Sequence, residues 1–222
     1  MKKLVFALIL GLGLVSLSAC SVPGRTNFGA GSVQAPVSNN KTDDTSSVFT
    51  DGAYQIDAAS SALSWEASKV VATHTGTVRV KSGSVQVSGG ALAGATVVMD
   101  MSSIASDQGI EALVTHLKNA DFFDAANYPE ARLVITSVNP GANEGEYALT
   151  GDLTIKNVTA PITFTAKVKT SGNELEAQSQ LSIDRTKWGI KYGSGQFFKD
   201  LGDNMIGDDI KFSVLIKATR QL

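Results

Sequence analysis

The chain has 222 residues, of which 43% are hydrophobic and 18% charged, so it is long enough to bury a hydrophobic core. Its 19 basic and 21 acidic residues give a net charge of −2 without a basic block, which argues against nucleic-acid binding. The single cysteine, Cys20, excludes an intrachain disulfide, and two histidines are too few for a Cys/His zinc cluster. The composition therefore predicts a globular protein with few residues suited to catalysis.

Residues 1–19 have the layout of a secretory signal peptide. Met1-Lys2-Lys3 is a positive segment, and an apolar run follows from Leu4 to Val15. As a helix this run would reach about 18 Å, short of the roughly 30 Å hydrocarbon core of a bilayer. Leu17-Ser18-Ala19-Cys20 resembles the lipobox of bacterial lipoproteins, in which the signal is cut before an acylated cysteine. We predict that Cys20 carries several acyl chains, palmitate among them.

Several acyl chains on one residue would anchor the protein to a membrane almost permanently. Ser21, rather than an aspartate, follows the cysteine. This resembles lipoproteins sorted to the outer membrane, so we expect a lipid-anchored protein of the bacterial cell envelope that faces the periplasm. The alternative is a free cysteine in an ordinary signal peptide.

Residues 20–50 are rich in Ser, Thr, Asn, Gly and Pro and have no sustained periodicity. This composition predicts a flexible tether that spans about 30 Å, although part of it would also suit an edge strand.

Residues 52–222 form the predicted domain, in which apolar and polar residues mostly alternate. Between residues 145 and 155, for example, Tyr147, Leu149 and Leu153 share one face, whereas Asp152 and Thr154 share the other. The predicted strands cover residues 63–67, 77–81, 84–87, 96–101, 132–138, 145–155, 162–169, 175–183 and 210–217. Turn residues such as Gly89-Gly90 separate them. Antiparallel strands with one apolar face can pair as a sandwich or close into a barrel, and their spacing alone fits both.

One segment, at about residues 107–119, has the period of a helix instead. Ile110, Leu113, Val114 and Leu117 recur on one face, and Ser106 or Asp107 is placed to cap the first turn. We expect this helix to lie across an open end of the sheet structure with its apolar face inward.

Three polar features are candidate catalytic groups. His116 lies near Asp121, His74 stands alone, and Asp184-Arg185 ends a strand before a long loop. The favoured interpretations are structural. His116 is a helix-face or cap-bonding histidine, and His74 is a polar turn residue or a lone hydrogen-bonding group. Arg185 holds the loop by a salt bridge or backbone hydrogen bonds through its fork of donors.

The larger apolar side chains suit either a solid core or the wall of a ligand cavity, because a barrel of about eight strands can hold one slender ligand.

Several segments resemble the YceI-like family of bacterial lipocalin-like barrels. They are residues 73–77, 81–83, 116–124 with Tyr128-Pro129, 151–161, 184–189 and 208–218. Lys187-Trp188 stands where the family more often has an acidic residue followed by Phe. The resemblance implies an all-β, antiparallel eight-stranded barrel around a hydrophobic tunnel that holds a polyisoprenoid, such as a quinone or polyprenol, and it implies no catalysis and no metal.

The family's pocket contacts are dispersed apolar side chains, so the site prediction selects residues near the helix and the long loop. The predicted ligand contacts are Trp65, Leu113, Leu117, Phe122, Phe123, Tyr147, Phe164, Trp188, Phe197 and Phe198. We expect a protein that binds, sequesters or carries a long-chain lipid and that pairs as a homodimer or remains single. The alternative is a structural or stress-response envelope lipoprotein whose filled barrel binds a protein partner.

Overall fold

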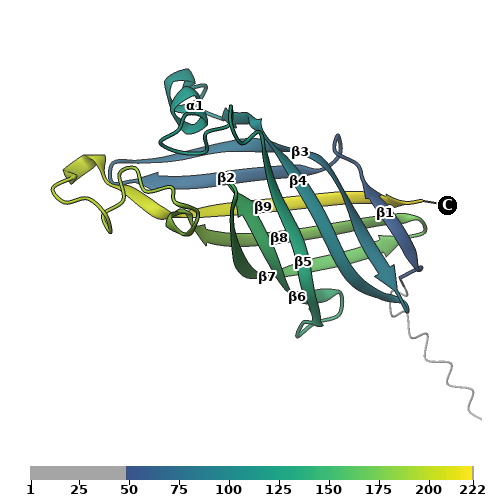
Figure 1. Cartoon of the computed structure of the whole chain (residues 1–222). Coiled ribbons are helices and arrows are strands. Elements are labelled where there is room, and N and C mark those ends of the chain that lie inside the picture. Colours follow the sequence, from purple (N-terminus) through teal and green to yellow (C-terminus); the bar gives the residue numbers. More distant parts are fainter. Residues whose placement is uncertain (1–48, 222) are drawn as a thin grey trace, which may run out of the picture. The chain divides into compact units, whose positions relative to one another are not determined.

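The computed structural model describes residues 49–221, so the predicted signal peptide, Cys20 and most of the predicted tether lie outside the described residues. This part of the chain is almost entirely antiparallel sheet (Figure 1). Its elements are β1 (Gly52–Ile56), β2 (Ala62–Lys69), β3 (Ala72–Ser88), β4 (Ala91–Ser106), α1 (Glu111–Lys118), β5 (Glu130–Pro140), β6 (Glu146–Ile155), β7 (Val158–Ser171), β8 (Glu174–Asp184), the short 3-10 helices η1 (Arg185–Trp188) and η2 (Gly202–Asn204), and β9 (Ile206–Arg220). Over residues 49–221, none of the helices has the length and apolar character needed to cross a bilayer.

Eight strands close into a barrel. The hydrogen-bonded order is β3-β2-β9-β8-β7-β6-β5-β4, and the pairing of β4 with β3 completes the ring. All the pairings are antiparallel. The predicted eight-stranded antiparallel barrel with one short helix is confirmed.

β1 and β2 lie end to end between β3 and β9, so together they fill one strand position of the barrel. β1 pairs with the end of β3 at residues 84–87 and with the end of β9 at residues 218–220. β2 pairs with the opposite ends of the same two strands. Between them the carboxylate of Asp57 accepts hydrogen bonds from the N–H groups of Ala59 and Ser60 at 2.9 and 3.2 Å. The sequence patterns did not predict β1, because five residues are too few to show a period.

Alternation along the strands sends one set of side chains into the barrel. On β8, Leu175, Ala177, Leu181 and Ile183 point inward, as the sequence pattern predicts. The predicted strands at residues 77–81 and 84–87 are parts of the single strand β3, whose register shifts between Val80 and Ser82. A bulge of this kind bends a long strand around a barrel without ending it.

The helix is shorter than predicted. It spans Glu111–Lys118 and begins after Ile110 without a side-chain cap. Ser106 belongs to the end of β4, and the N–H of Asp107 donates to the carbonyl of Thr75 on β3 at 3.0 Å. Both expected caps are therefore bound to the sheet, and Gly109, with φ 66°, turns the chain into the helix.

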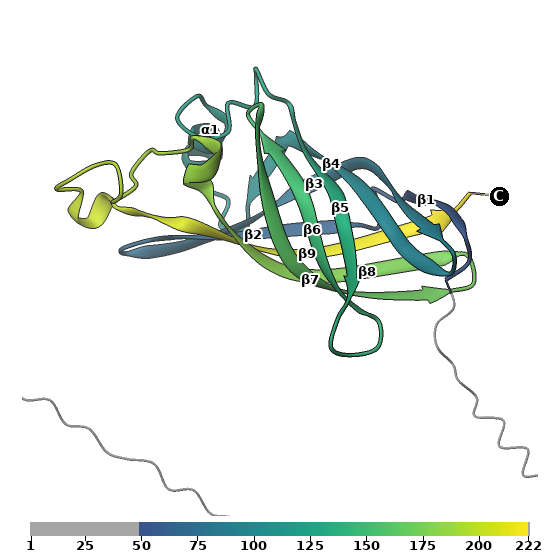
Figure 2. The ribbon, with the colours of Figure 1, turned by 60° about the horizontal axis from the view of Figure 1, so that its bottom comes forward.

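The two ends of the barrel differ. α1, the β2–β3 turn and the loop between η1 and β9 gather at one end, which we call the helix end, whereas β1 and the C-terminus lie at the other (Figures 1 and 2). Each end has its own cluster of buried residues. Trp65, Met101 and Trp188 belong to the helix-end cluster, and Tyr54 and Leu175 belong to the other.

Candidate functional site

An apolar cavity of about 190 Å³ lies inside the barrel. Several inward-facing side chains, such as Leu133, Phe164 and Phe212, are only partly buried, because they border open space instead of packed atoms. An apolar cavity of about 150 Å³ is known to hold benzene. The interior is therefore a cavity and not a solid core. The composition of the chain is compatible with both.

The cavity runs along most of the barrel. Leu92 lines it near the start of β4 and Ile104 lines it near the end of the same strand. A strand rises about 3.3 Å per residue and tilts by about 40° in such barrels, so this stretch corresponds to roughly 30 Å along the axis. A long, narrow and apolar space suits a hydrocarbon chain better than a compact metabolite.

Polar groups are scarce along the cavity. Within the part of the chain that the structure describes, Gln178 and Ser179 are the lining residues that carry amide or hydroxyl groups, and Ser179 donates its hydroxyl to the carbonyl of Thr165 at 2.7 Å. A ligand in this space would be held by burial of apolar surface, at about 25 cal/mol per Å².

Four of the ten predicted contact residues line the cavity. They are Trp65, Leu117, Phe123 and Phe164.

Four others pack around the cavity without lining it. Leu113 and the buried Phe122 and Trp188 pack at the helix end. Tyr147 packs in the opposite cluster, where it meets Phe49 edge to face at 6.0 Å between ring centroids. Burial raises the pKa of the Tyr147 hydroxyl.

Phe197 and Phe198 are the exceptions. Their side chains are 48% and 49% exposed, and neither lines the cavity. They lie in the loop between η1 and β9. Contact with a ligand remains a prediction for all ten residues, and Cys20 lies outside the described residues.

Sequence reasoning overlooked the small residues that leave room for the cavity. Ala95, Ala131 and Ala177 line it. The strand alternation marks these positions as inward, and small side chains at inward positions are the signal that would have found them. The site prediction selected large side chains, most of them aromatic, and so did not use this signal.

β7 and β8 pair over only part of their length. Their pairing extends only from Ser171 and Glu174 to Ala166 and Ser179, and beyond that point the two strands separate. An outer groove lies against this gap, and Ser179 and Val214 line both the groove and the cavity.

η1 covers the neighbouring part of the helix end. Its Trp188 side chain is 1% exposed and donates its indole N–H to the carbonyl of Leu153 on β6 at 2.8 Å. This contact ties η1 to the wall beyond the point where β7 and β8 separate.

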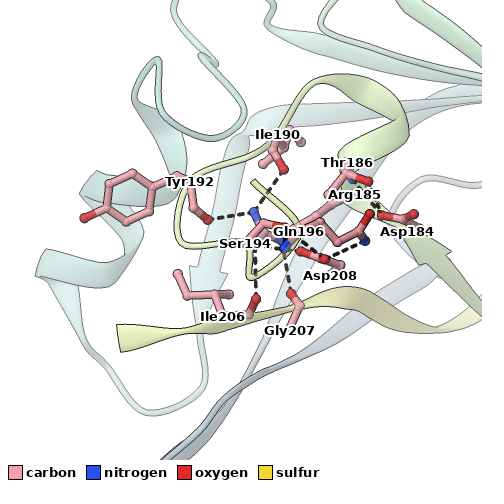
Figure 3. Close-up of polar contacts among 10 residues, drawn as sticks. All are labelled: Asp184, Arg185, Thr186, Ile190, Tyr192, Ser194, Gln196, Ile206, Gly207 and Asp208. Atoms are coloured by element: carbon pink, nitrogen blue, oxygen red, sulfur yellow. Dashed lines mark hydrogen bonds and ion pairs between the residues drawn. The ribbon is translucent and has the colours of Figure 1, made fainter. Parts of the chain in front are cut away.

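Arg185 holds the long loop at the helix end in place (Figure 3). Its guanidinium group, 1% exposed, donates to the carbonyls of Gly207, Ile190, Tyr192 and Ile206 at 2.9–3.2 Å. The predicted role of Arg185 is confirmed.

Asp208 completes this network. Its carboxylate accepts from Arg185 at 3.2 Å, from the Ser194 hydroxyl at 3.0 Å and from the Gln196 amide at 2.8 Å. Burial lowers the pKa of Arg185, and the charges of Asp208 and Asp184 oppose that effect. The guanidinium stays protonated, since arginine does not lose its proton in proteins.

The remaining polar candidates have structural surroundings. His116 Nε2 lies 3.1 Å from an Asp121 carboxylate oxygen at the surface, and the His116 ring meets Phe122 and Tyr192 edge to face. Asp184 accepts from the N–H and hydroxyl of Thr186 and so caps η1. Over residues 49–221, no three His, Cys, Asp or Glu side chains gather to hold a metal ion.

Two buried nitrogen atoms have no hydrogen-bond partner in the described structure. They are Nε1 of Trp65 and Nδ1 of His74. Both atoms have almost no accessible surface. His74 lies within β3 opposite Ala67, so it is a strand residue and the prediction of a turn residue is wrong.

Comparison with known proteins shows the family to which this barrel belongs. The model of the YceI-like domain matches residues 54–218, well over half of the chain. The chain belongs to the YceI-like family. Protein YceI of Escherichia coli O157:H7 is 42% identical over 59 residues, which cover 27% of this chain and 30% of that relative. The chain thus matches less than a third of the length of the curated YceI-like relatives.

Solved structures share the fold. BcnA of Burkholderia cenocepacia has a TM-score of 0.62 and 24% identity, over 74% of this chain and 99% of that one. A polyisoprenoid-binding domain from Saccharophagus degradans has a TM-score of 0.61 and 19% identity, over 77% of this chain and 99% of that one. At these identities the likeness concerns the YceI-like fold alone.

Proposed function

We propose that this protein binds a long-chain isoprenoid lipid in the barrel and sequesters or carries it in the bacterial cell envelope, without catalysis. The observation that carries the proposal is the elongated apolar cavity, whose few polar groups suit a hydrocarbon chain. Membership of the YceI-like family supports it, as does the likeness to a domain described as polyisoprenoid-binding. A quinone or a polyprenol has the required shape and polarity.

The cavity also favours this proposal over the alternative of an envelope protein with a filled barrel. A filled barrel would bury its inward side chains completely, whereas Leu133, Phe164 and Phe212 remain partly accessible. The two polar pairs considered for catalysis lie apart from the cavity lining, which favours binding over turnover.

The test is to extract the purified protein with organic solvent and to identify the lipid by mass spectrometry. The Ala177→Phe variant places a ring in the cavity and should lose bound lipid while the barrel remains folded by circular dichroism. The Ala93→Phe variant is the matched control, because Ala93 is exposed and faces outward on β4. Equal lipid content in both variants, or no lipid and no uptake of added farnesol by the unmodified protein, would refute the proposal.

We propose further that acyl chains on Cys20 anchor the protein to the outer membrane on its periplasmic side. The lipobox-like Leu17-Ser18-Ala19-Cys20 supports this, and several acyl chains bind a membrane far more firmly than one. The Cys20→Ala variant should appear in the soluble fraction or accumulate as the uncut precursor. Unchanged membrane fractionation with a normally processed chain would contradict the proposal.

A further inference from the structure

Large apolar side chains are exposed at one end of the barrel. Over residues 49–221, eight such residues are exposed, and all of them lie in or beside turns and loops at the helix end. Five form the set that we call the apolar end surface: Val70, Val71, Phe197, Phe198 and Met205, with exposed fractions of 56, 66, 48, 49 and 42%. Scattered exposed apolar residues are ordinary on proteins, but a group of them at one end points to an interaction.

Direct contacts join the segments that carry this surface. The N–H of Val70, in the β2–β3 turn, donates to the carbonyl of Met205 at 3.2 Å. Lys69 Nζ, beside that turn, lies 3.2 Å from the amide oxygen of Asn204. Figures 1 and 2 show the β2–β3 turn and the loop between η1 and β9 projecting from the same end of the barrel. The turn and the loop therefore present one surface.

The base of the loop is held in place, so the exposure of its tip is a fixed feature of the fold. The Arg185 network binds the loop where it leaves η1 and where it enters β9. Ser194 is fully buried and receives the N–H groups of Phe197 and Phe198 on its carbonyl at 3.1 and 3.0 Å. These bonds turn the backbone at Phe197 and Phe198 while both side chains remain about half exposed.

We propose that the apolar end surface docks the barrel onto a lipid bilayer, with Phe197 and Phe198 inserted among the lipid headgroups. This inference rests on the proposed function, and it names the surface through which the lipid would pass between membrane and cavity. Leu117 of α1 and Phe123 line the cavity at this end. A hydrocarbon chain that enters the cavity at this end would be exposed to less water, on its way from the bilayer, than one that enters at the opposite end.

The chemistry of the surface favours a bilayer over a protein partner. Its apolar side chains belong to a turn and a loop that project from the barrel, and apolar side chains on projecting segments can enter the headgroup region of a bilayer. Lys69, Lys191 and Lys199 lie in or beside the same turn and loop, as do the exposed Asp200 and Asp203. Long lysine side chains can bring their amines to lipid phosphates while their stems lie against apolar groups. Lys191 Nζ lies 4.6 Å from the centre of the Phe197 ring.

The predicted anchor keeps a membrane within reach. The predicted tether, residues 20–50, joins the domain at the end opposite the helix end, where Phe49 packs. Fully extended, 31 residues would reach about 100 Å, more than the length of the barrel, so the helix end could turn toward the same bilayer. Residues 49–221 contain 19 acidic and 15 basic residues, so we expect apolar insertion, and not attraction to anionic lipid, to provide most of the docking energy.

The first experiment measures insertion directly. The acylated full chain with Phe198→Trp is reconstituted into vesicles of phosphatidylethanolamine and phosphatidylglycerol that contain brominated phospholipid, which quenches tryptophan fluorescence on contact. The native Trp65 and Trp188 are 7% and 1% exposed and supply the background signal. Ser88→Trp is the control, because Ser88 is exposed beside the β3–β4 turn at the opposite end. We expect at least twofold stronger quenching for Phe198→Trp, and equal quenching would overturn the proposal.

The second experiment measures lipid transfer between donor and acceptor vesicles, with farnesol as the probe. The Val71→Ser, Met205→Ser double variant changes two exposed residues that are not among the predicted ligand contacts. It should transfer farnesol about tenfold more slowly and bind the same amount at equilibrium. An unchanged rate would overturn the docking proposal. So would a change from dimer to monomer in the double variant, because the surface would then join two copies of the chain. Failure of the unmodified protein to bind farnesol counts against the proposed function. The quenching experiment tests membrane docking alone, so its result does not depend on farnesol binding.

Discussion

Replacing Arg185 with methionine tests whether the buried guanidinium holds the helix end together. Methionine keeps an unbranched side chain of similar length but removes five hydrogen bonds, four of them to backbone carbonyls and one to Asp208. Each hydrogen bond to a charged group contributes about 1.5–3 kcal/mol, but the desolvation of the guanidinium opposes this gain. Loss of one partner from a buried ion pair costs about 3–5 kcal/mol, which is the expected loss of unfolding free energy for Arg185→Met.

The assay is chemical and thermal unfolding followed by circular dichroism. For a domain of this size each 1 kcal/mol corresponds to about 2–4 °C, so the melting temperature should fall by roughly 10 °C. Arg79→Met is the matched control, because Arg79 pairs with Asp100 at 3.2 Å with a side chain that is 75% exposed, and such pairs contribute about 0–1 kcal/mol. If Arg185→Met loses no more stability than this control, the loop is held by other contacts and the reasoning is refuted.

Two further predictions concern the strands and their turns. In Gly76→Ala the new methyl group would overlap the Ala105 carbonyl and the ring of Trp65, so we expect a loss of about 1–3 kcal/mol in urea unfolding. Gly94→Ala, with its nearest neighbour at 3.5 Å, should change stability by less than about 0.5 kcal/mol, and equal losses would contradict the argument. The N–H groups of Gly90 and Gly89 donate to the Asp51 carboxylate and hold its pKa below the ordinary value of 3.8. Since a lowered pKa stabilises the fold above pH 3.8 and that stability is lost as pH falls through the folded-state pKa, Asp51→Asn should melt at a lower temperature than the unmodified protein at pH 7. The difference in melting temperature, followed by circular dichroism, should become smaller as the pH is lowered to 2, and an undiminished difference would refute the reasoning.

Strand alternation made most of the barrel predictable. Most inward positions of a strand are apolar, so β8 can be predicted from Leu175, Ala177, Leu181 and Ile183, although Ser179 between them is polar. β1 escaped notice because its inward residues, Tyr54 and Ile56, are too few to establish a period. Its place depends on pairing with β3 and β9, which are distant in the sequence.

The cavity was harder to predict than the barrel. Whether inward side chains fill a barrel depends on its diameter and on the sum of their volumes, and neither is a local property of the sequence. Phe164 and Phe212 have the same residue type as Phe198, yet they line the cavity whereas Phe198 is exposed on a loop. The helix start was mispredicted for a related reason: Ser106 is the last residue of β4 and therefore does not cap the helix.

The order of the strands also bears on how this chain folds. β9 pairs with β1, β2 and β8, so its fifteen residues join the first strands to the last. In the β2–β9 pairing Ala62 meets Leu215, a contact between opposite ends of the domain. Such distant contacts form slowly, and the barrel cannot close until synthesis of the C-terminal strand is complete. Until β9 pairs, β2 and β8 remain open sheet edges, and open edges favour aggregation. The risk of aggregation should therefore fall only when β9 joins the sheet.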